Sequence, residues 1–216
     1  MKMKKYLSVV IMCLLSANLL PQEVDVESIL KQLSNKIKDH NTIQTNFIFS
    51  NLDHEDKVVD SFEGEMLIKD QKYKLTFTGN EIISDGKFIW QYIEEINEVT
   101  ISEKEEDESL LSNPRKIFTI YEYEFKYKFN KEVTLNNDVY YEIDLFPIKL
   151  DESNFSRIRL LINKTDVELY SIKYFGKDGN KFSIIIDDFI TGINLDDSIF
   201  VFDEKKYPEI EINDMR

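Results

Sequence analysis

The feature that most constrains this chain is an alternation of apolar and polar residues that begins at Thr42 and recurs, segment after segment, to Ile190. A period of two places successive side chains on opposite faces of a strand. The connections between segments are short, which favours antiparallel pairing of neighbours in a meander. Within one segment lies Gly64, where we expect a bulge or a bend. The predicted strands, about eleven, cover residues 43–51, 58–69, 72–78, 82–84, 88–92, 99–101, 124–133, 139–146, 155–163, 167–175 and 181–190.

The segment from Ile82 to Tyr92 predicts a β-hairpin with Asp85-Gly86 at its turn. This dipeptide tolerates the positive φ angles of a two-residue connection. The second strand carries Trp90, the only tryptophan of the chain, two residues before Tyr92. Because of that spacing, we expect both rings to project from one face of the strand.

Two amphipathic helices are expected beside the strands. Apolar residues from Val26 to Ile37 recur at intervals of three and four, with Asp25 as a plausible N-cap. Residues 109–121 show a second apolar stripe, in which Pro114 suits the first turn. This many strands favours strong curvature over a flat sheet. The predicted fold is α+β but mainly β: one domain, in which a curved antiparallel sheet, an incomplete half-barrel, is covered by a lid of two or three helices.

The N-terminus has the pattern of a secretory signal peptide over residues 1–22, which leaves 23–216 as the folded domain. Three lysines precede an apolar run from Tyr6 to Leu20, which is too short for a confident membrane span. We expect cleavage between Ala17 and Glu23 and a periplasmic location. The alternatives are a retained anchor or a lipoprotein signal, but Cys13 follows bulky residues and does not suit acylation.

Composition and charge exclude several functions. Loss of the three signal lysines would take the formal charge from -14 to about -17. Such an acidic surface disfavours nucleic acid, which requires clustered Lys and Arg. His40 and His54, the two histidines, have no nucleophile in a suitable motif, and no phosphate-binding glycine motif occurs. The run from Asp53 to Asp56 resembles a hydrated hairpin tip more than a cation site. We therefore expect no enzyme, no cofactor and no metal.

Aromatic residues are abundant for a chain with so little polar chemistry: fifteen Phe, eleven Tyr and one Trp. One interpretation is an ordinary solid core. The other is that rings on a concave sheet, facing two amphipathic helices, leave room for a flexible apolar ligand.

Several motifs together resemble the LolA family of periplasmic lipoprotein carriers, from about Val26 to the last residue. The segments that show the resemblance are Phe-Glu-Gly-Glu-Met-Leu-Ile-Lys (62–69), Ile-Ser-Asp-Gly-Lys-x-x-Trp-x-Tyr (83–92), Glu-Val-Thr-Ile (98–101), Asn113-Pro114 and Gly-Lys-Asp-Gly-Asn (176–180). The ending from Phe200 to Arg216 resembles that of Bacteroidetes-type members. Where many members have an Arg-Pro pair whose arginine latches the lid, this chain has Asp70-Gln71. Lys72 or Lys74 could substitute, and otherwise we expect a lid that opens more easily.

The resemblance implies a monomeric carrier that takes the acyl chains of lipoproteins from an inner-membrane ABC release complex to an outer-membrane acceptor. Alternatives of the same fold are a periplasmic sensor of lipid or lipoprotein, an acylated outer-membrane acceptor and another lipid carrier. The residues that the resemblance places around the acyl-chain cavity are Phe47, Phe49, Met66, Ile68, Tyr73, Leu75, Trp90 and Tyr92 on the first strands, Ile117 and Phe118 on the lid, and Ile158 and Leu160 on a late strand. A one-residue error in strand phase would move a whole row to the other face.

Overall fold

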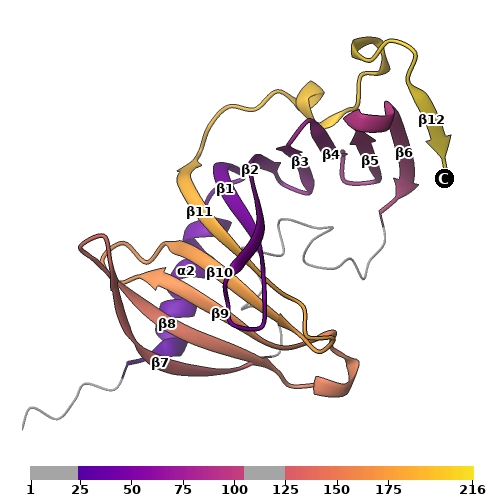
Figure 1. Cartoon of the computed structure of the whole chain (residues 1–216). Coiled ribbons are helices and arrows are strands. Elements are labelled where there is room, and N and C mark those ends of the chain that lie inside the picture. The colour runs from indigo at the N-terminus through magenta and orange to yellow at the C-terminus, as the bar shows by residue number, and fades with distance from the viewer. Residues whose placement is uncertain (1–23, 105–124) are drawn as a thin grey trace, which may run out of the picture.

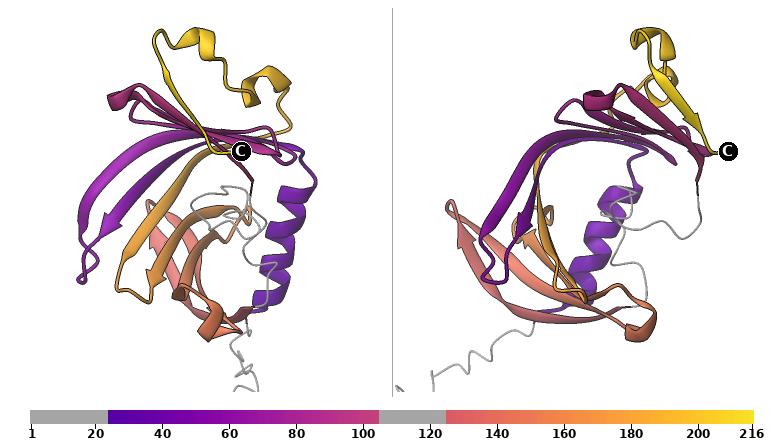
Figure 2. Two further views of the ribbon diagram at one scale, coloured as in Figure 1. Left: turned by 90° about the vertical axis from the view of Figure 1, so that its right-hand side faces the viewer. Right: turned by 45° about the vertical axis from the view of Figure 1, so that its right-hand side comes forward.

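The computed structural model describes residues 24–104 and 125–216. Twelve strands form one sheet, in the order β12-β6-β5-β4-β3-β2-β1-β11-β10-β9-β8-β7. The sheet curves strongly, and helix α2 lies on its concave side (Figures 1 and 2). The strands are β1 (Thr42–Leu52), β2 (Val58–Lys69), β3 (Lys72–Phe77), β4 (Asn80–Ser84), β5 (Phe88–Ile93), β6 (Glu98–Glu103), β7 (Phe125–Leu135), β8 (Asp138–Pro147), β9 (Phe155–Asn163), β10 (Leu169–Gly176), β11 (Lys181–Thr191) and β12 (Glu211–Asp214).

Helix α2 spans Val26–Lys38, as its apolar spacing predicts. The side chain of Asp25 accepts a hydrogen bond from the backbone N–H of Ser28 at 3.0 Å and so caps the first turn. The apolar stripe packs on the sheet through four buried side chains: Val26, Ile29, Leu30 and Leu33. The second expected helix, over 109–121, lies outside the described residues, and α2 is the one α-helix in the described ranges.

The sheet is built from antiparallel hairpins, and its halves meet where β1 pairs with both β2 and β11. Direct cross-strand partners share a face, so the register fixes which side chains meet. Phe49 lies opposite Phe62 on one side and Ile184 on the other, and all three belong to the concave core under α2. The predicted open, curved, mainly antiparallel sheet is therefore confirmed.

The C-terminal strap, which we define as residues 196–214, covers the opposite, convex face at the other end of the sheet. It contains the short 3-10 helices η4 (Asp197–Phe200) and η5 (Glu204–Lys206) and ends in β12, which pairs with β6 in parallel. Figure 1 shows this strap in yellow beside β5 and β6. The C-terminal segment thus includes a twelfth strand, absent from the strands predicted above, which pairs with β6 through its backbone.

Two local predictions are wrong. The hairpin at Asp85-Gly86 has a three-residue connection, in which only Gly86 has positive φ, at 96°. The Asp85 carboxylate accepts hydrogen bonds from the N–H groups of Lys87 and Phe88, each at 2.8 Å, and so closes the longer turn. Of the two alternatives expected at Gly64, the bulge is wrong, because β2 passes through Gly64 in register with β1 and β3; the bend stays a prediction.

Candidate functional site

Eight of the twelve residues predicted for the cavity lie together on the concave face of the sheet. They belong to one apolar cluster that also contains the buried side of α2: Phe47, Phe49, Met66, Ile68, Tyr73, Leu75, Ile158 and Leu160. Seven of these side chains are buried, whereas Phe49 is only half-buried. The alternation along β1, β2, β3 and β9 therefore places these side chains on one face of the sheet, and their role in binding stays a prediction. The seven buried members belong to the same core cluster as the buried side of α2.

Trp90 and Tyr92 are placed on the opposite face, so the expectation that they share a surface with the other eight is wrong. Trp90 pairs directly with Ile83, and Tyr92 with Glu81. Tyr92 lies in a separate cluster with Val99 and the strap, against which Trp90 packs. Both faces of β5 carry apolar residues, because the strap covers the convex one, and alternation alone cannot choose between them.

Ile117 and Phe118 lie outside the described residues, so their place near the cavity stays a prediction. The two lysines offered as latch substitutes have other partners within the described part of the chain. Lys72 forms an ion pair with Asp197 at 3.1 Å, and Lys74 forms one with Glu81 at 3.0 Å.

A continuous row of aromatic rings crosses the concave face near one end of the strands. Neighbouring rings in this aromatic row lie 4.6 to 6.0 Å apart between centroids, the spacing of direct ring contact. Of its members, Phe182 is buried and the others are half-buried. The row consists of Phe77 (β3), Phe62 (β2), Phe49 (β1), Phe182 (β11), Tyr174 (β10), Phe155 (β9) and Phe125 (β7).

Sequence reasoning identifies only Phe49 among these seven as a site residue. Phe62 and Phe77 are in phase with Met66 and Leu75 on their own strands, so the alternation that finds the latter also points to them. The remaining rings stand at or near strand ends, where alternation is short. Only the register shows that they are neighbours across the sheet.

Gly64 leaves room on the concave face for the ring of Phe47. The ring of Phe47 lies over it, and a Cβ added at Gly64 would stand 2.5 Å from the Phe47 ring and 2.7 Å from the Thr76 carbonyl oxygen. Both distances are far below van der Waals contact. The glycine is therefore required for the close approach of ring and backbone, a common role for glycine within a strand.

The row has little charge. Burial and then the nearby Asp178 carboxylate raise the pKa of Tyr174, so its hydroxyl stays neutral. Beyond the row, Asp56 forms ion pairs with Lys173 at 2.7 Å and Lys181 at 2.9 Å. Hydrogen bonds from these two ammonium groups lower the pKa of Asp56 to about 2. Within 24–104 and 125–216, the row itself consists of apolar rings and one neutral hydroxyl.

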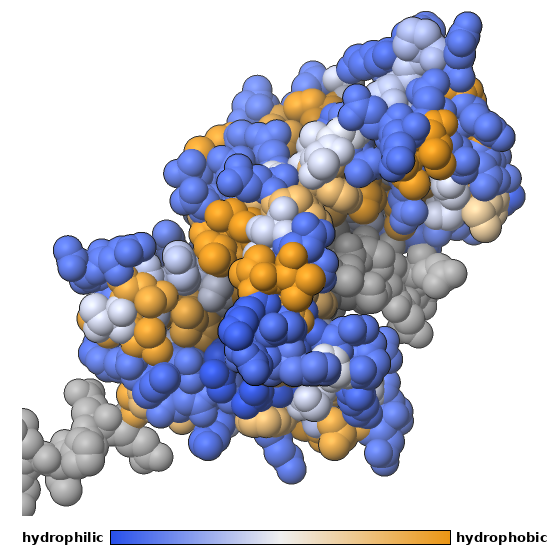
Figure 3. Space-filling model, viewed as in Figure 1, coloured by the Kyte–Doolittle hydropathy of each residue, from blue (hydrophilic) through white to orange (hydrophobic). Residues whose placement is uncertain are grey.

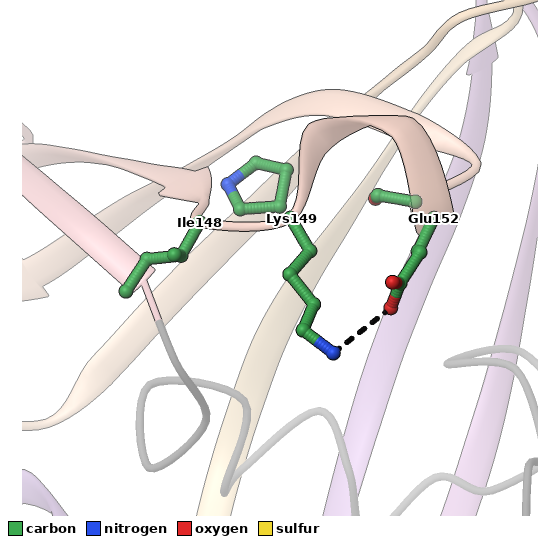
Figure 4. A pocket seen from close by; sticks show the side chains of 5 residues that line it. Ile148, Lys149 and Glu152 are labelled. Carbon is green, nitrogen blue, oxygen red and sulfur yellow. Dashed lines mark hydrogen bonds and ion pairs between the residues drawn. The ribbon is translucent and has the colours of Figure 1, made fainter.

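A small pocket of about 170 Å³ lies at the turn after β8. It is lined by Pro147, Ile148, Lys149, Glu152 and Ser153. Figure 4 shows Lys149 and Glu152 directed toward each other, joined by an ion pair of 3.1 Å. Its volume is below the roughly 300–1,000 Å³ usual for ligand sites, and none of its lining residues belongs to the aromatic row.

Neither metal chemistry nor a membrane-spanning helix is indicated by the described ranges. Across 24–104 and 125–216, no three His, Cys, Asp or Glu side chains are grouped to hold a metal ion. In the hairpin tip that begins at Asp53, the Asp53 carboxylate accepts from the N–H groups of Glu55 and Lys57 instead. None of the described helices has the length and apolar character needed to cross a bilayer.

Comparison with known proteins gives a family and a fold. Residues 38–203 match the family described as outer membrane lipoprotein carrier protein LolA. An uncharacterized conserved protein from Thermus thermophilus has a similar structure, with a TM-score of 0.56 and 14% identity over 87% of this chain and 98% of that one. No curated protein matches.

Two further solved structures are similar at lower scores. LprF from Mycobacterium bovis gives a TM-score of 0.48 and 10% identity over 79% of this chain and 95% of its own. The LolA superfamily protein NE2245 from Nitrosomonas europaea gives 0.43 and 14% over 83% and 98%.

Proposed function

The chain belongs to the LolA family of outer membrane lipoprotein carrier proteins, and from this premise we propose that it is a periplasmic chaperone for lipoproteins. It binds their acyl chains on the concave face, receives them from an inner-membrane ABC release complex and delivers them to an outer-membrane acceptor. It acts as a monomer and catalyses no reaction. The observation that carries the proposal is the aromatic row, an apolar surface that stays half-exposed beside a buried core.

The energetics of the cargo require such a surface. Three long acyl chains expose some forty methylenes, and burial of each contributes about 0.8 kcal/mol, or roughly 30 kcal/mol in all. A carrier has to offset most of this free energy of exposure and still release the acyl chains. A row of rigid rings suits that task, because it offers large contact area at low cost in side-chain entropy. Tyr174, the one polar member, is held neutral by its surroundings.

The test is a release assay. Spheroplasts or proteoliposomes that hold a labelled lipoprotein are incubated with the purified protein, and the soluble one-to-one complex is measured. Phe62→Glu and Tyr174→Glu should each lower the yield at least about tenfold, since a carboxylate among apolar chains must be desolvated or protonated.

Phe175→Glu is the matched control. Phe175 follows Tyr174 directly but points to the convex face, where the Arg157 guanidinium lies 3.9 Å from its ring centroid and Lys173 lies 5.4 Å away. A glutamate there meets cations and leaves the concave face unchanged. Equal loss of complex in Tyr174→Glu and Phe175→Glu, or none in either, would contradict the assignment of the row as the cargo site.

A further inference from the structure

Three loops at one end of the strands are tied into a single edge, which we call the rim. Its three loops are residues 53–57 between β1 and β2, taken together with Val58 and Val59 at the start of β2, residues 148–154 between β8 and β9, and residues 177–180 between β10 and β11. The Lys181 ammonium donates to the His54 carbonyl at 2.8 Å, which joins the first loop to the third. Lys177 donates from its backbone N–H to the Asn154 carbonyl at 3.0 Å, and from its side chain to the Leu150 carbonyl, which joins the third to the second.

The rim exposes aliphatic side chains in two of its loops. Val58 and Val59 are 61% and 70% exposed, and Ile148 and Leu150 are 50% and 48% exposed. Single exposed apolar residues are normal on a soluble protein, but these occur as two pairs on connected loops. Figure 3 shows hydrophobic residues gathered near the middle of the view, where Figure 1 draws the β1–β2 hairpin.

The aromatic row lies directly behind the rim. Phe155 follows the loop residue Asn154, Phe182 stands two residues after Asn180, and Phe62 stands three residues after Val59. A ligand that leaves the row toward this end of the sheet therefore reaches the exposed aliphatic pairs next.

Three of the six carboxylates of the rim form ion pairs with lysines. Glu55 pairs with Lys57 at 2.5 Å. Glu152 pairs with Lys149 at 3.1 Å. Asp56 forms ion pairs with Lys181, the first residue of β11, and with Lys173 of β10. The rim thus has neither the free lysine cluster that anionic lipid attracts nor the Arg and Trp anchors typical of a protein interface.

We propose that the rim contacts the surface of a zwitterionic lipid bilayer, with the valine pair and the Ile148–Leu150 pair entering the headgroup region. This inference rests on the proposed function, because it assigns the route by which acyl chains pass between the bilayer and the row. Exposed aliphatic side chains gain free energy from entering such an interface, and they leave it readily because few methylenes are buried.

A dye that brightens in a bilayer tests the contact position by position. The full chain is prepared with Cys13→Ser, which removes its only cysteine, and with Val59→Cys labelled with NBD. The matched control carries NBD at Ile96→Cys, a 56% exposed residue of the short helix η1 (Glu94–Ile96), where β5 turns into β6. Vesicles contain phosphatidylcholine and phosphatidylethanolamine and no protein. We expect emission to rise at position 59 and to stay unchanged at position 96.

A second variant asks whether the rim acts as one surface. The chain labelled at position 59 is given two further substitutions, Ile148→Asp and Leu150→Asp. They should weaken its partition to vesicles about fivefold or more, although the label is at the start of β2 and not on the same loop. No rise at position 59, an equal rise at both labels, or a rise only with vesicles that carry integral membrane proteins would overturn the inference.

Binding of a triacylated lipopeptide without vesicles separates the two proposals. If the wild-type chain and the rim variants bind it equally while position 59 stays dark, only the bilayer contact fails. If the wild-type chain does not bind it, the proposed function fails.

Discussion

At the scale of single residues, the concave surface depends on the absence of one side chain. Gly64→Ala places a methyl group against the Phe47 ring and the Thr76 carbonyl. Alanine in a strand normally gains from a less flexible unfolded chain, but overpacking against backbone typically costs about 1–3 kcal/mol. We expect a net loss of unfolding free energy, measured by urea denaturation. Phe47→Leu in the same chain should restore part of it, and an unchanged or higher midpoint in Gly64→Ala would refute the close approach.

Asp56 makes stability depend on pH in a predictable direction. Its pKa falls from 3.8 to about 2 on folding because of the hydrogen bonds from Lys173 and Lys181. A carboxyl whose pKa is lower in the folded chain stabilises it above the unfolded pKa, and this contribution is lost as pH falls from about 4 to about 2.

The comparison of wild type with Asp56→Asn measures that contribution. The variant should be less stable at neutral pH by about 1 kcal/mol or less, because the carboxylate is nearly half exposed. The difference should vanish near pH 2. A difference that stays constant from pH 7 to pH 2 would show that the ion pairs are not its cause.

The ion pairs of Asp144 should contribute more to stability than those of Asp56, because the Asp144 carboxylate is buried. Arg159 donates to its two carboxylate oxygens at 2.7 and 3.0 Å, and Arg157 adds a third contact at 3.2 Å. Burial raises the pKa of Asp144, but the hydrogen bonds from Arg159 and Asn130 and the charges of Arg159 and Arg157 together leave the pKa below its ordinary value. Asp144→Ala removes all three of these contacts, although Arg159 keeps Glu142 as a partner at 3.3 Å, and should cost about 2–3 kcal/mol in thermal or urea unfolding. A cost below that of Asp56→Asn would contradict this ranking.

At the scale of elements, the strap is held by its aromatic contacts. The Tyr207 ring lies 4.4 Å from Tyr92 and 4.7 Å from Phe202 between centroids. Its hydroxyl donates to the Glu81 carboxylate at 2.9 Å. Burial and then this carboxylate raise the pKa of Tyr207 far above its ordinary value, so the donor persists through alkaline pH.

Two variants at Tyr207 separate these contributions. Tyr207→Phe keeps the rings and loses one hydrogen bond, about 1 kcal/mol. Tyr207→Ala loses both and should cost about 2–3 kcal/mol because the ring is half-buried. Unfolding followed by the fluorescence of Trp90, which packs on this cluster, measures both. Equal costs would mean that the rings contribute nothing.

Sequence patterns predict the helix and the strands of this chain better than they predict which face of the sheet each side chain occupies. Helix α2 and eleven strands follow from periods of 3.6 and two, and the turn at Asn136-Asn137 has positive φ at both residues, as its composition predicts. The pattern assigns strand β5 to the wrong face because the strap lies far away in sequence. Strand β12 has no apolar alternation to read, since its pairing with β6 uses the backbone. The aromatic row depends on register across seven strands, which alternation within single strands does not supply.

At the scale of the whole molecule, one sheet is covered on opposite faces at its two ends. Helix α2 covers the concave side, and the strap covers the convex side of β5 and β6 (Figure 2). The two apolar clusters have separate members, so a change in one need not disturb the other. Trp90 therefore reports the strap, and we expect its emission to stay constant when cargo occupies the row.

Photo-crosslinking tests the central claim most directly. A triacylated lipopeptide with a photoactivatable group in one acyl chain is bound to the protein, illuminated and mapped by peptide mass spectrometry. Crosslinks should fall on the strand ends that carry Phe49, Phe62, Phe155, Tyr174 and Phe182, and Tyr174→Glu should remove them. Crosslinks on the strap and β5, around Tyr92 and Phe202, or none on the concave face, would contradict the account.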